Sequence, residues 1–241
     1  SIHGGTGTIS TMSAGSQGID SGATGVVSAM SGGIQYIRSG GTSRDTMIYG
    51  GIQLIANGGT ANNTIVNGGT AAILGAGAAV EDVTMTGGEY LLGTDGGTYY
   101  INGNFGFSGG NFDMTKNISG STPGSYETLN IDNLQHGGGT FIMDTDLASE
   151  TNGDEIYITS ANAGKSYIQV KDASLLSGTA VTEHKNLLLV TVASGTATFE
   201  GKNLNSGGLW TLTPKIENGA NVTDSLGNVI GNSRQWYLTH V

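Results

Sequence analysis

The sequence has no cysteine and only 2 prolines, and 12% of its 241 residues are charged. The lack of cysteine disfavours a small scaffold held together by disulfides. The chain has 43 glycines, but glycine without proline excludes a collagen-like helix, and a hydrophobic content of 37% is too high for a disordered tail. The composition therefore indicates a folded chain in which glycine recurs for a structural reason.

Basic residues are also scarce. The chain has 9 basic and 19 acidic side chains, and its formal net charge is -10. Binding a polyanion requires a basic stripe, and none is visible, so the sequence predicts no nucleic-acid partner. No apolar run approaches the roughly 18 residues of a membrane-spanning helix. Because Ser1 begins the sequence without a methionine or a signal peptide, we expect a mature or excised piece of a longer protein.

The sequence contains instead a repeat of paired small residues. Between Gly4 and Ala76 the steps from one pair to the next alternate between ten and eight positions, so every second pair marks one period of eighteen. Beyond Ala76 the spacing lengthens. A fixed period of this kind is typical of a solenoid, in which each repeat forms one coil. The pairs are Gly4-Gly5, Ala14-Gly15, Gly22-Ala23, Gly32-Gly33, Gly40-Gly41, Gly50-Gly51, Gly58-Gly59, Gly68-Gly69 and Ala76-Gly77.

Side chains form columns when the sequence is read at this period. Two columns are apolar and predict continuous ladders inside the coils, whereas a third column is threonine and can face outward. The first apolar column is Ile19, Ile37, Ile55, Ile73 and Leu92. The second is Met12, Met30, Ile48 and Val66, with Met85 one place later. The threonine column is Thr6, Thr24, Thr42 and Thr60.

The repeat excludes helices, because glycine interrupts every run after eight or ten residues. Short segments such as IQYI, IQLI and TIV are typical of strands. We therefore predict an all-β fold, a right-handed parallel β-helix (solenoid) with a C-terminal β-rich cap. Equivalent residues of successive coils would then stack about 4.8 Å apart. The glycine pairs would form the corners, where the backbone turns sharply and stacked coils approach closely.

The character of the sequence changes along the chain, and we divide it into three parts. We expect residues 1–110 to form the regular coils, residues 111–136 to form irregular coils, and residues 137–241 to form the cap. The third part holds longer strand candidates, such as TFIMDTD and NLLLVTV, and both tryptophans, Trp210 and Trp236. A solenoid exposes an apolar cross-section at its end, so a cap with larger side chains is expected there.

Two stretches of the chain carry a resemblance to known proteins. The Gly-Gly-Thr coils resemble the passenger of self-associating bacterial autotransporters of the diffuse-adherence adhesin kind. The stretch GGGTFIMDTDLASETNGDEIYITSANAGKSYIQV, followed by NLLLVTVASGTATFEG and QWYL, is similar to the pertactin-like autochaperone segment that closes such passengers. The matching positions are Gly139, Thr140, Phe141, Thr145, Asp146, Asn152, Gly153, Asp154, Leu188, Leu189, Val190, Trp236 and Leu238.

This resemblance implies a bacterial surface protein, exported and anchored by an outer-membrane β-barrel that follows Val241 in the parent protein. It also implies that the terminal segment folds first and templates the coils that precede it. The residues implied as the core of this autochaperone are Phe141, Leu188, Leu189, Val190, Trp210, Trp236 and Leu238.

Motifs for catalysis are weak, and we expect no enzyme and no cofactor. The stretch GFSGG fits the nucleophile-elbow pattern around Ser108, but a glycine-rich chain produces such a match by chance, and no strand-to-helix context follows. The histidines are scattered without the spacing of metal ligands. They are His3, His136, His184 and His240.

The acidic residues of the third part offer the next candidate. Asp144, Asp146, Asp154 and Glu155 could be read as a paired-carboxylate site or a Ca²⁺ site. Acidic turns on a cap are more often solvated, and the glycine pairs lack the regular aspartates of calcium-binding β-rolls. We therefore expect no metal and a solvated position for these turns.

Binding is the class of function that remains. A rod whose outer face is threonine, serine and asparagine can pair with a copy of itself through many weak hydrogen bonds. The leading hypothesis is adhesion, either by self-association between cells or by attachment to host surface receptors, with the threonine column as an adhesive or glycan-bearing surface. The alternative is a β-helical stalk that displays an upstream domain, for example a protease. The polar side chains could also serve only to keep the rod soluble.

Overall fold

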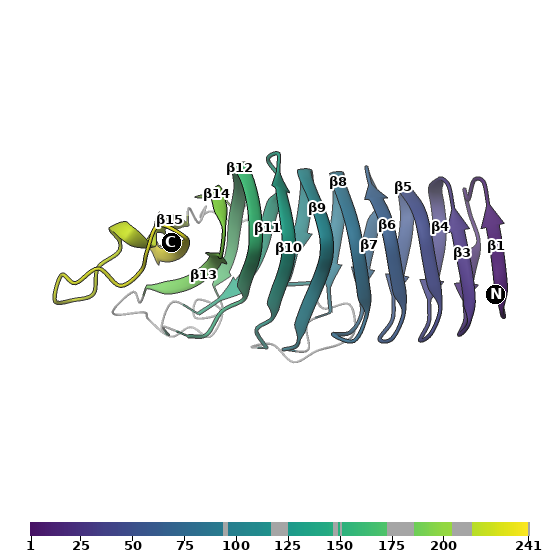
Figure 1. Ribbon diagram of the computed structural model, residues 1–241, viewed down its shortest axis with the longest axis horizontal. Coiled ribbons are helices and arrows are strands. Elements are labelled where there is room, and N and C mark those ends of the chain that lie inside the picture. Colours follow the sequence, from purple (N-terminus) through teal and green to yellow (C-terminus); the bar gives the residue numbers. More distant parts are fainter. Residues whose placement is uncertain are drawn as a thin grey trace, which may run out of the picture.

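The computed structural model describes residues 1–93, 96–116, 125–146, 149, 151–172, 186–203 and 214–240. It is an elongated stack that starts at β1 and ends beyond β14, where β15 and the C-terminus lie (Figure 1). All sixteen strands belong to one sheet, and a short 3-10 turn at Gly219–Asn221 is the only helical element among the described residues. The predicted all-β class is confirmed. Within the described ranges, no helix is both long and apolar enough to span a membrane.

The strands are short at first and lengthen along the chain. They are β1 Gly5–Ile9, β2 Ser16–Ile19, β3 Ala23–Val27, β4 Met30–Ile37, β5 Thr42–Ile55, β6 Thr60–Val66, β7 Thr70–Ile73, β8 Ala79–Leu92, β9 Thr98–Asp113, β10 Thr128–His136, β11 Thr140–Thr145, β12 Glu155–Asp172, β13 Leu187–Val192, β14 Gly195–Gly201, β15 Lys215–Asn218 and β16 Gln235–His240.

Pairing between coils is parallel and follows the period that the sequence predicts. Thr24 of β3 pairs with Thr42 of β5, one full period later, and Thr42 pairs with Thr60 of β6 at the same offset. The offset grows by one position between Thr60 and Ala79 and by more in the later coils. Each coil therefore stacks on the next, and the larger offsets reflect longer connections between strands. This stacking continues past residues 110 and 136, where we placed the limits of the regular coils and of the cap.

Each coil consists of three strand segments separated by corners. In β5 the segments are 42–44, 46–49 and 52–55, as the register with its neighbours shows. The glycine pair Gly50-Gly51 forms one corner, as predicted, with Gly51 at φ 79°. The second glycine pair of the period, Gly58-Gly59, follows the third segment, whereas the bend at Asp45 was not predicted. Asp45, Asn63 and Asp82 repeat there with φ of 51°, 54° and 51°, a left-handed conformation that Asp and Asn tolerate better than most residues.

Stacking of the coils explains why glycine is needed at the corner. A Cβ added to Gly51 would lie 2.6 Å from the carbonyl oxygen of Gly33, its counterpart one coil earlier. Gly15 has a similar φ of 80°, yet nothing lies within 4 Å of its Cβ position. The conformational requirement is therefore shared by both glycines, whereas the steric requirement arises only where another coil packs beneath.

The interior is built from the two predicted apolar ladders, which are confirmed. Members of each column pair in register from coil to coil, and every member is at most 5% exposed. Full burial of an aliphatic side chain contributes about 1.5–3 kcal/mol of transfer free energy. Since the ladders run from the first coil onward, they form the continuous core that holds the coils together.

A third interior ladder is polar and was not predicted. Gln17, Gln35 and Gln53 are at most 4% exposed, although each stands beside a buried isoleucine column. The Nε2 of Gln35 donates to Oε1 of Gln17 at 2.8 Å, and the Nε2 of Gln53 donates to Oε1 of Gln35 at 2.8 Å. The hydroxyl of Ser43 also donates to Oε1 of Gln35 at 3.0 Å. These bonds satisfy the amides of Gln35 and Gln53, which would otherwise be costly to bury, whereas Nε2 of Gln17 at the start of the ladder is buried without a hydrogen-bond partner among the described residues.

Aromatic side chains fill the wider coils in the middle of the stack. The ring centroids of Phe105 and Phe107 lie 4.9 Å apart, and Phe107 meets Phe141 edge-on at 4.8 Å. Phe112 and Tyr90 stack with centroids 5.3 Å apart. Aromatic pairs in such geometries stabilise a core beyond the area they bury. The larger offset between these coils thus accompanies larger side chains inside them.

The last strands reverse direction and close the stack. β16 pairs antiparallel with β13 and with β15, whereas the earlier pairings between named strands are parallel. Trp236 of β16 pairs with Val190, and its ring meets the ring of Phe199 edge-on at 5.0 Å. The antiparallel strands therefore cover the end of the parallel stack with large apolar side chains, as expected for a cap.

Candidate interaction surface

The predicted threonine column lies on the outer side of the first segments. Thr6, Thr24, Thr42 and Thr60 pair in register across four successive coils. Thr6 is exposed and the other three are half-buried, whereas the neighbours of Thr24, Ala23 and Gly25, are buried. Because side chains alternate between the two faces of a strand, the column faces away from the core. We call the outer side of these first segments the threonine face.

Beyond the fourth threonine the same face changes its residues. Thr60 pairs with Ala79 of β8, and the first segments of the wider coils follow in β9, β10 and β12. There Tyr100 pairs with Asn130, and Asn130 pairs with Tyr157. The threonine face therefore continues into a part that carries two tyrosines and an asparagine.

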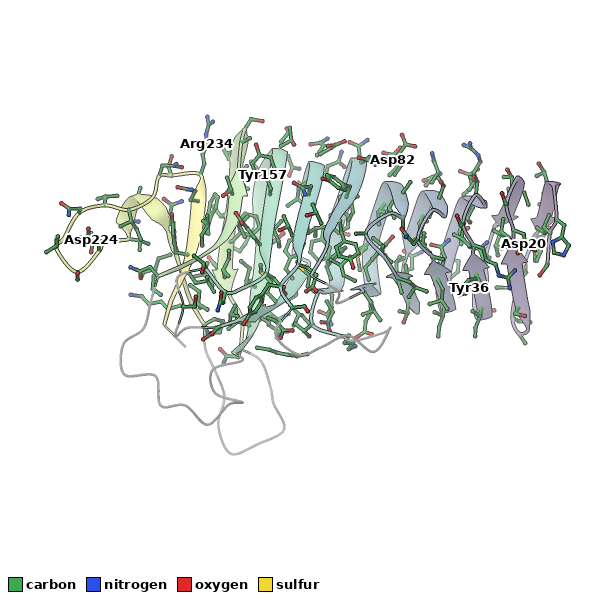
Figure 2. All side chains as sticks on the ribbon, turned by 90° about the horizontal axis from the view of Figure 1, so that it is seen from below. Asp20, Tyr36, Asp82, Tyr157, Asp224 and Arg234 are labelled. Atoms are coloured by element: carbon green, nitrogen blue, oxygen red, sulfur yellow. The ribbon has the colours of Figure 1, made fainter. Side chains whose placement is uncertain are left out.

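A ridge of amide and carboxylate side chains borders the threonine face at the left-handed corner. Nδ2 of Asn63 donates to Oδ1 of Asp45 at 2.7 Å, and the amide nitrogen of Asn104 donates to Oδ1 of Asp82 at 2.9 Å. Nδ2 of Asn62 donates to Oε2 of Glu81 at 2.6 Å. Asp82 lies on the same side of the stack as Tyr157 (Figure 2). The ridge is thus an ordered polar border made of repeated side-chain bonds between coils.

The candidates for catalysis are dispersed in the structure. The hydroxyl of Ser108 donates to the carbonyl oxygen of Met85 at 3.2 Å, a contact between stacked coils. Nδ1 of His3 lies 2.5 Å from Oδ2 of Asp20, which also pairs with Arg38 in the first coils. His184 lies outside the described residues. Among the described residues, no group of three or more His, Asp and Glu side chains has the arrangement of a metal site.

The expectation of solvated acidic turns is wrong for Asp154. This residue is 0% exposed. Its Oδ1 accepts from the amide nitrogen of Glu127 at 2.8 Å, and its Oδ2 accepts from the amide nitrogen of Asp144 at 2.7 Å. The carboxyl group, which stands just before β12, thus connects the residue before β10 with a residue of β11. The physical reason is that these two backbone donors hold the side chain inside the stack and keep its oxygens hydrogen-bonded there.

Burial also changes the acidity of this region. Burial raises the pKa of Asp154 well above its usual range, and the neighbouring Glu127 raises it further, against the effect of the two backbone donors. Burial raises the pKa of Asp144 to about 6, and the charges of Glu127 and Asp113 reinforce this shift while that of Lys171 opposes it. Glu155 is affected in the same direction by burial, which raises its pKa. These acids therefore hold protons at a higher pH than solvated carboxyl groups do.

The residues implied as the autochaperone core lie at the closing end of the stack. Phe141, Leu189, Val190, Trp236 and Leu238 are each at most 5% exposed. Leu188 is half-buried and pairs with Tyr237. Because successive side chains of a strand point to opposite faces, Leu188 lies on the face opposite to that of the buried Leu189. Trp210 lies outside the described residues. The residues of this group that are buried thus belong to the cap and to the aromatic core next to it.

Comparison with known families adds to this geometry. A profile of the Pertactin family matches residues 103–214, which begin near the end of the coils that we predicted to be regular and extend into the predicted cap. Over these residues, which make up just under half of the chain, the sequence is similar to the Pertactin family. The pertactin family implies the β-helix region of an autotransporter passenger, secreted to the cell surface, in agreement with the stacked parallel coils. Pertactin domains are generally non-catalytic. No curated protein matched the sequence.

Proposed function

We propose that the chain is the adhesive part of an autotransporter passenger, of the self-associating, diffuse-adherence adhesin kind, wound as a right-handed parallel β-helix. The observation that supports this most is the threonine column. Four hydroxyl groups in register present the same chemistry once per coil, about 4.8 Å apart. A partner with a matching repeat, such as a second copy, can contact several coils at once.

Repetition compensates for the weakness of each contact. A single exposed hydrogen bond contributes little free energy, because water competes for the same groups. When several coils bind together, each further contact forms at a high effective concentration, so the affinities multiply. The low charge of the coils supports this proposal, since like-charged surfaces would repel each other. The partner is then a copy on a neighbouring cell or a receptor on a host surface, and the threonines are also suited to carry O-linked glycans.

We further propose that residues 137–241 act as the autochaperone of this passenger. The antiparallel cap supports this, because it covers the open end of the stack with Trp236 and Leu238. In a solenoid, folding can begin at the most stable unit and spread through contacts between neighbouring coils. A cap that folds first would present a finished edge on which the preceding coil can pair.

A sedimentation assay tests the adhesive role. The chain would be displayed on bacteria that do not aggregate, in wild-type form and as the double variant Thr24→Glu/Thr42→Glu. We expect wild-type cells to clump and settle, and the variant cells to remain suspended, because glutamates on facing copies repel each other.

The control places the same charges on another side of the coil. Ser16 and Thr70 lie in one outward column of the third segments, in register with Ile34 and Ile52. Cells that display Ser16→Glu/Thr70→Glu should settle like the wild type. If wild-type cells neither clump nor attach to any cell type, the adhesive proposal is wrong. If both double variants settle equally well, adhesion does not use the threonine face.

A further inference from the structure

Two large aromatic side chains stand exposed on the C-terminal part of the threonine face. Tyr100 of β9 is 50% exposed and Tyr157 of β12 is 39% exposed. Asn130 of β10 lies between them and pairs in register with both. The two exposed rings, in one outward column, offer aromatic faces to a ligand.

The backbone beneath these side chains is rigid. On either side of Tyr100, Tyr99 and Ile101 are at most 1% exposed, and the hydroxyl of Tyr99 donates to the carbonyl oxygen of Gly93 at 2.5 Å. Ile156 and Ile158, which flank Tyr157, are 0% exposed. Because these neighbours are locked in the core, the backbone that carries the two outward tyrosines is fixed before any ligand arrives, which lowers the entropic cost of binding.

The spacing of the two rings selects the size of a ligand. Tyr100 and Tyr157 are two strand positions apart, about 9.6 Å at the spacing of paired strands. This is close to the length of two sugar units in an extended 1,4-linked chain. The face of an aromatic ring is electron-rich and attracts the polarised C–H groups that line one side of a hexose ring. Asn130, with an amide that both donates and accepts, lies where hydroxyl groups between the two rings would be.

The charges around the two tyrosines disfavour an anionic ligand. The three first segments read TYYIN, TLNID and EIYIT, without lysine or arginine. Their acids are Asp132, whose Oδ2 accepts from the amide nitrogen of Gly103 at 3.0 Å, and Glu155, which is half-buried. A sulfated or acidic glycan would find no cationic partner on these segments and would meet carboxylates. A neutral glycan would meet no such repulsion.

We propose that Tyr100, Asn130 and Tyr157 bind a neutral, extended 1,4-linked oligosaccharide. Two of its sugar units lie over the tyrosine rings, and the amide of Asn130 bonds to hydroxyl groups between them. This proposal rests on the proposed function only in that it assumes a position at the cell surface. There the oligosaccharide would be the ligand through which the chain attaches to a host or matrix. It is distinct from the threonine column, which lies on earlier coils and is proposed to bind a second copy.

Titration with soluble oligosaccharides tests this site on the whole 241-residue chain. The probes are hexasaccharides of 1,4-linked glucose and of 1,4-linked N-acetylglucosamine, with heparin as the anionic probe, and binding is followed by tyrosine fluorescence and calorimetry. We expect saturable binding of at least one neutral hexasaccharide and none of heparin. Tyr100→Ala and Tyr157→Ala should each weaken it at least tenfold, and Asn130→Ala several-fold.

The matched control is Tyr49→Ala. Tyr49 is 54% exposed and lies in a second segment, away from the three residues of the site. This variant should bind as the wild type does, and thermal unfolding should show that all four variants remain folded. The proposal is overturned if neither neutral probe binds, if heparin binds equally well, or if Tyr49→Ala weakens binding as much as the other variants.

The sedimentation assay separates this proposal from the previous one. Loss of sugar binding in Tyr157→Ala with unchanged clumping supports the saccharide site. Self-association is then assigned to the threonine column. Loss of clumping in Tyr157→Ala, together with no sugar binding by the wild type, identifies the tyrosines as a contact between copies and overturns the saccharide site.

Discussion

Single carboxyl groups inside the stack behave differently from those on its surface. Asp20 and Asp224 are held ionised by their partners: the Arg38 guanidinium beside Asp20 and the amides of Asn228 beside Asp224 lower their pKa values. The pKa of Asp154 is instead raised, because burial is the dominant effect on that carboxyl group. The closing end of the stack therefore contains acids that gain protons readily, although the chain as a whole is acidic.

The Asp144→Asn variant tests this at one residue. The folded pKa of Asp144 is about 6, above the usual 3.8. Between these values the unfolded chain loses its proton while the folded chain keeps it, so the contribution of this group to the free energy of unfolding falls as pH rises from 4 to 6. Above pH 6 it stays constant. Given the partial exposure of Asp144, we expect a total change of about 1–2 kcal/mol.

Urea unfolding of both proteins between pH 4 and pH 7 measures this effect. The difference in unfolding free energy, wild type minus variant, should decline across the window and then level off, because asparagine does not titrate. Parallel pH profiles of the two proteins would show that Asp144 ionises in the folded chain as it does in the unfolded one.

Corners decide how the strand elements meet. The glycine corner needs both a left-handed backbone and room for the coil beneath, whereas the Asp45 corner needs the left-handed backbone and offers a side chain for bonding between coils. The two kinds of corner thus differ in chemistry, and the coil that contains Asp45 has two of the first kind and one of the second. One is compact and the other forms the polar ridge beside the threonine face.

Comparing Gly51→Ala with Gly15→Ala separates the two requirements of the glycine corner. Both residues have φ near 80°, so both variants lose about 1 kcal/mol from backbone strain. Only the Cβ of Ala at 51 meets a carbonyl oxygen, that of Gly33, and the backbone shift should cost about 1–3 kcal/mol more. Urea unfolding measures both values. Equal destabilisation of the two variants would mean that the stacked coils adjust freely at this corner.

The sequence was sufficient to predict the elements whose signal repeats. The apolar columns and the glycine corners follow from the period alone, because a residue buried in one coil is buried at the same place in the next. The glutamine ladder was not predicted, since glutamine is usually solvent-exposed and its partner is another glutamine one period away. The Asp45 bend was missed because it falls within the ten-residue half, where no glycine marks it. Tyr100 and Tyr157 could not be aligned, because their coils have lengths that the repeat no longer predicts.

At the scale of the whole molecule, the cap and the coils form one continuous sheet. Among the described residues, the parallel strands of each coil pair with those of the coils next to it, so the stability of the stack is approximately a sum over neighbouring interfaces and depends on how its ends are closed. An uncovered end exposes the apolar ladders and the unpaired edge of the last strands to water. The antiparallel strands β15 and β16 therefore affect residues far from them in the sequence.

Replacing Trp236 by alanine tests this dependence. Trp236 is 5% exposed, and its removal should cost about 3–5 kcal/mol. If the cap supports the whole stack, hydrogen exchange should rise in the coils of residues 1–110 as well as in the cap. Leu238→Ala should act in the same direction. Leu226→Ala is the control, because Leu226 is 85% exposed and its loss should leave exchange unchanged. A cap that exchanges rapidly while residues 1–110 stay protected would contradict this view.

Because the early coils pair at a constant offset, the stack can become longer or shorter by whole coils while the contacts between coils stay the same. Gln35 bonds to Gln17 and Gln53 in the same way, and Ile37 pairs with Ile19 and Ile55 in the same register. Duplicating one whole period in the gene would therefore lengthen the stack by about 4.8 Å and leave every ladder continuous. Adding a single residue would turn the buried columns toward water. The length of the stack can thus evolve in steps of one coil.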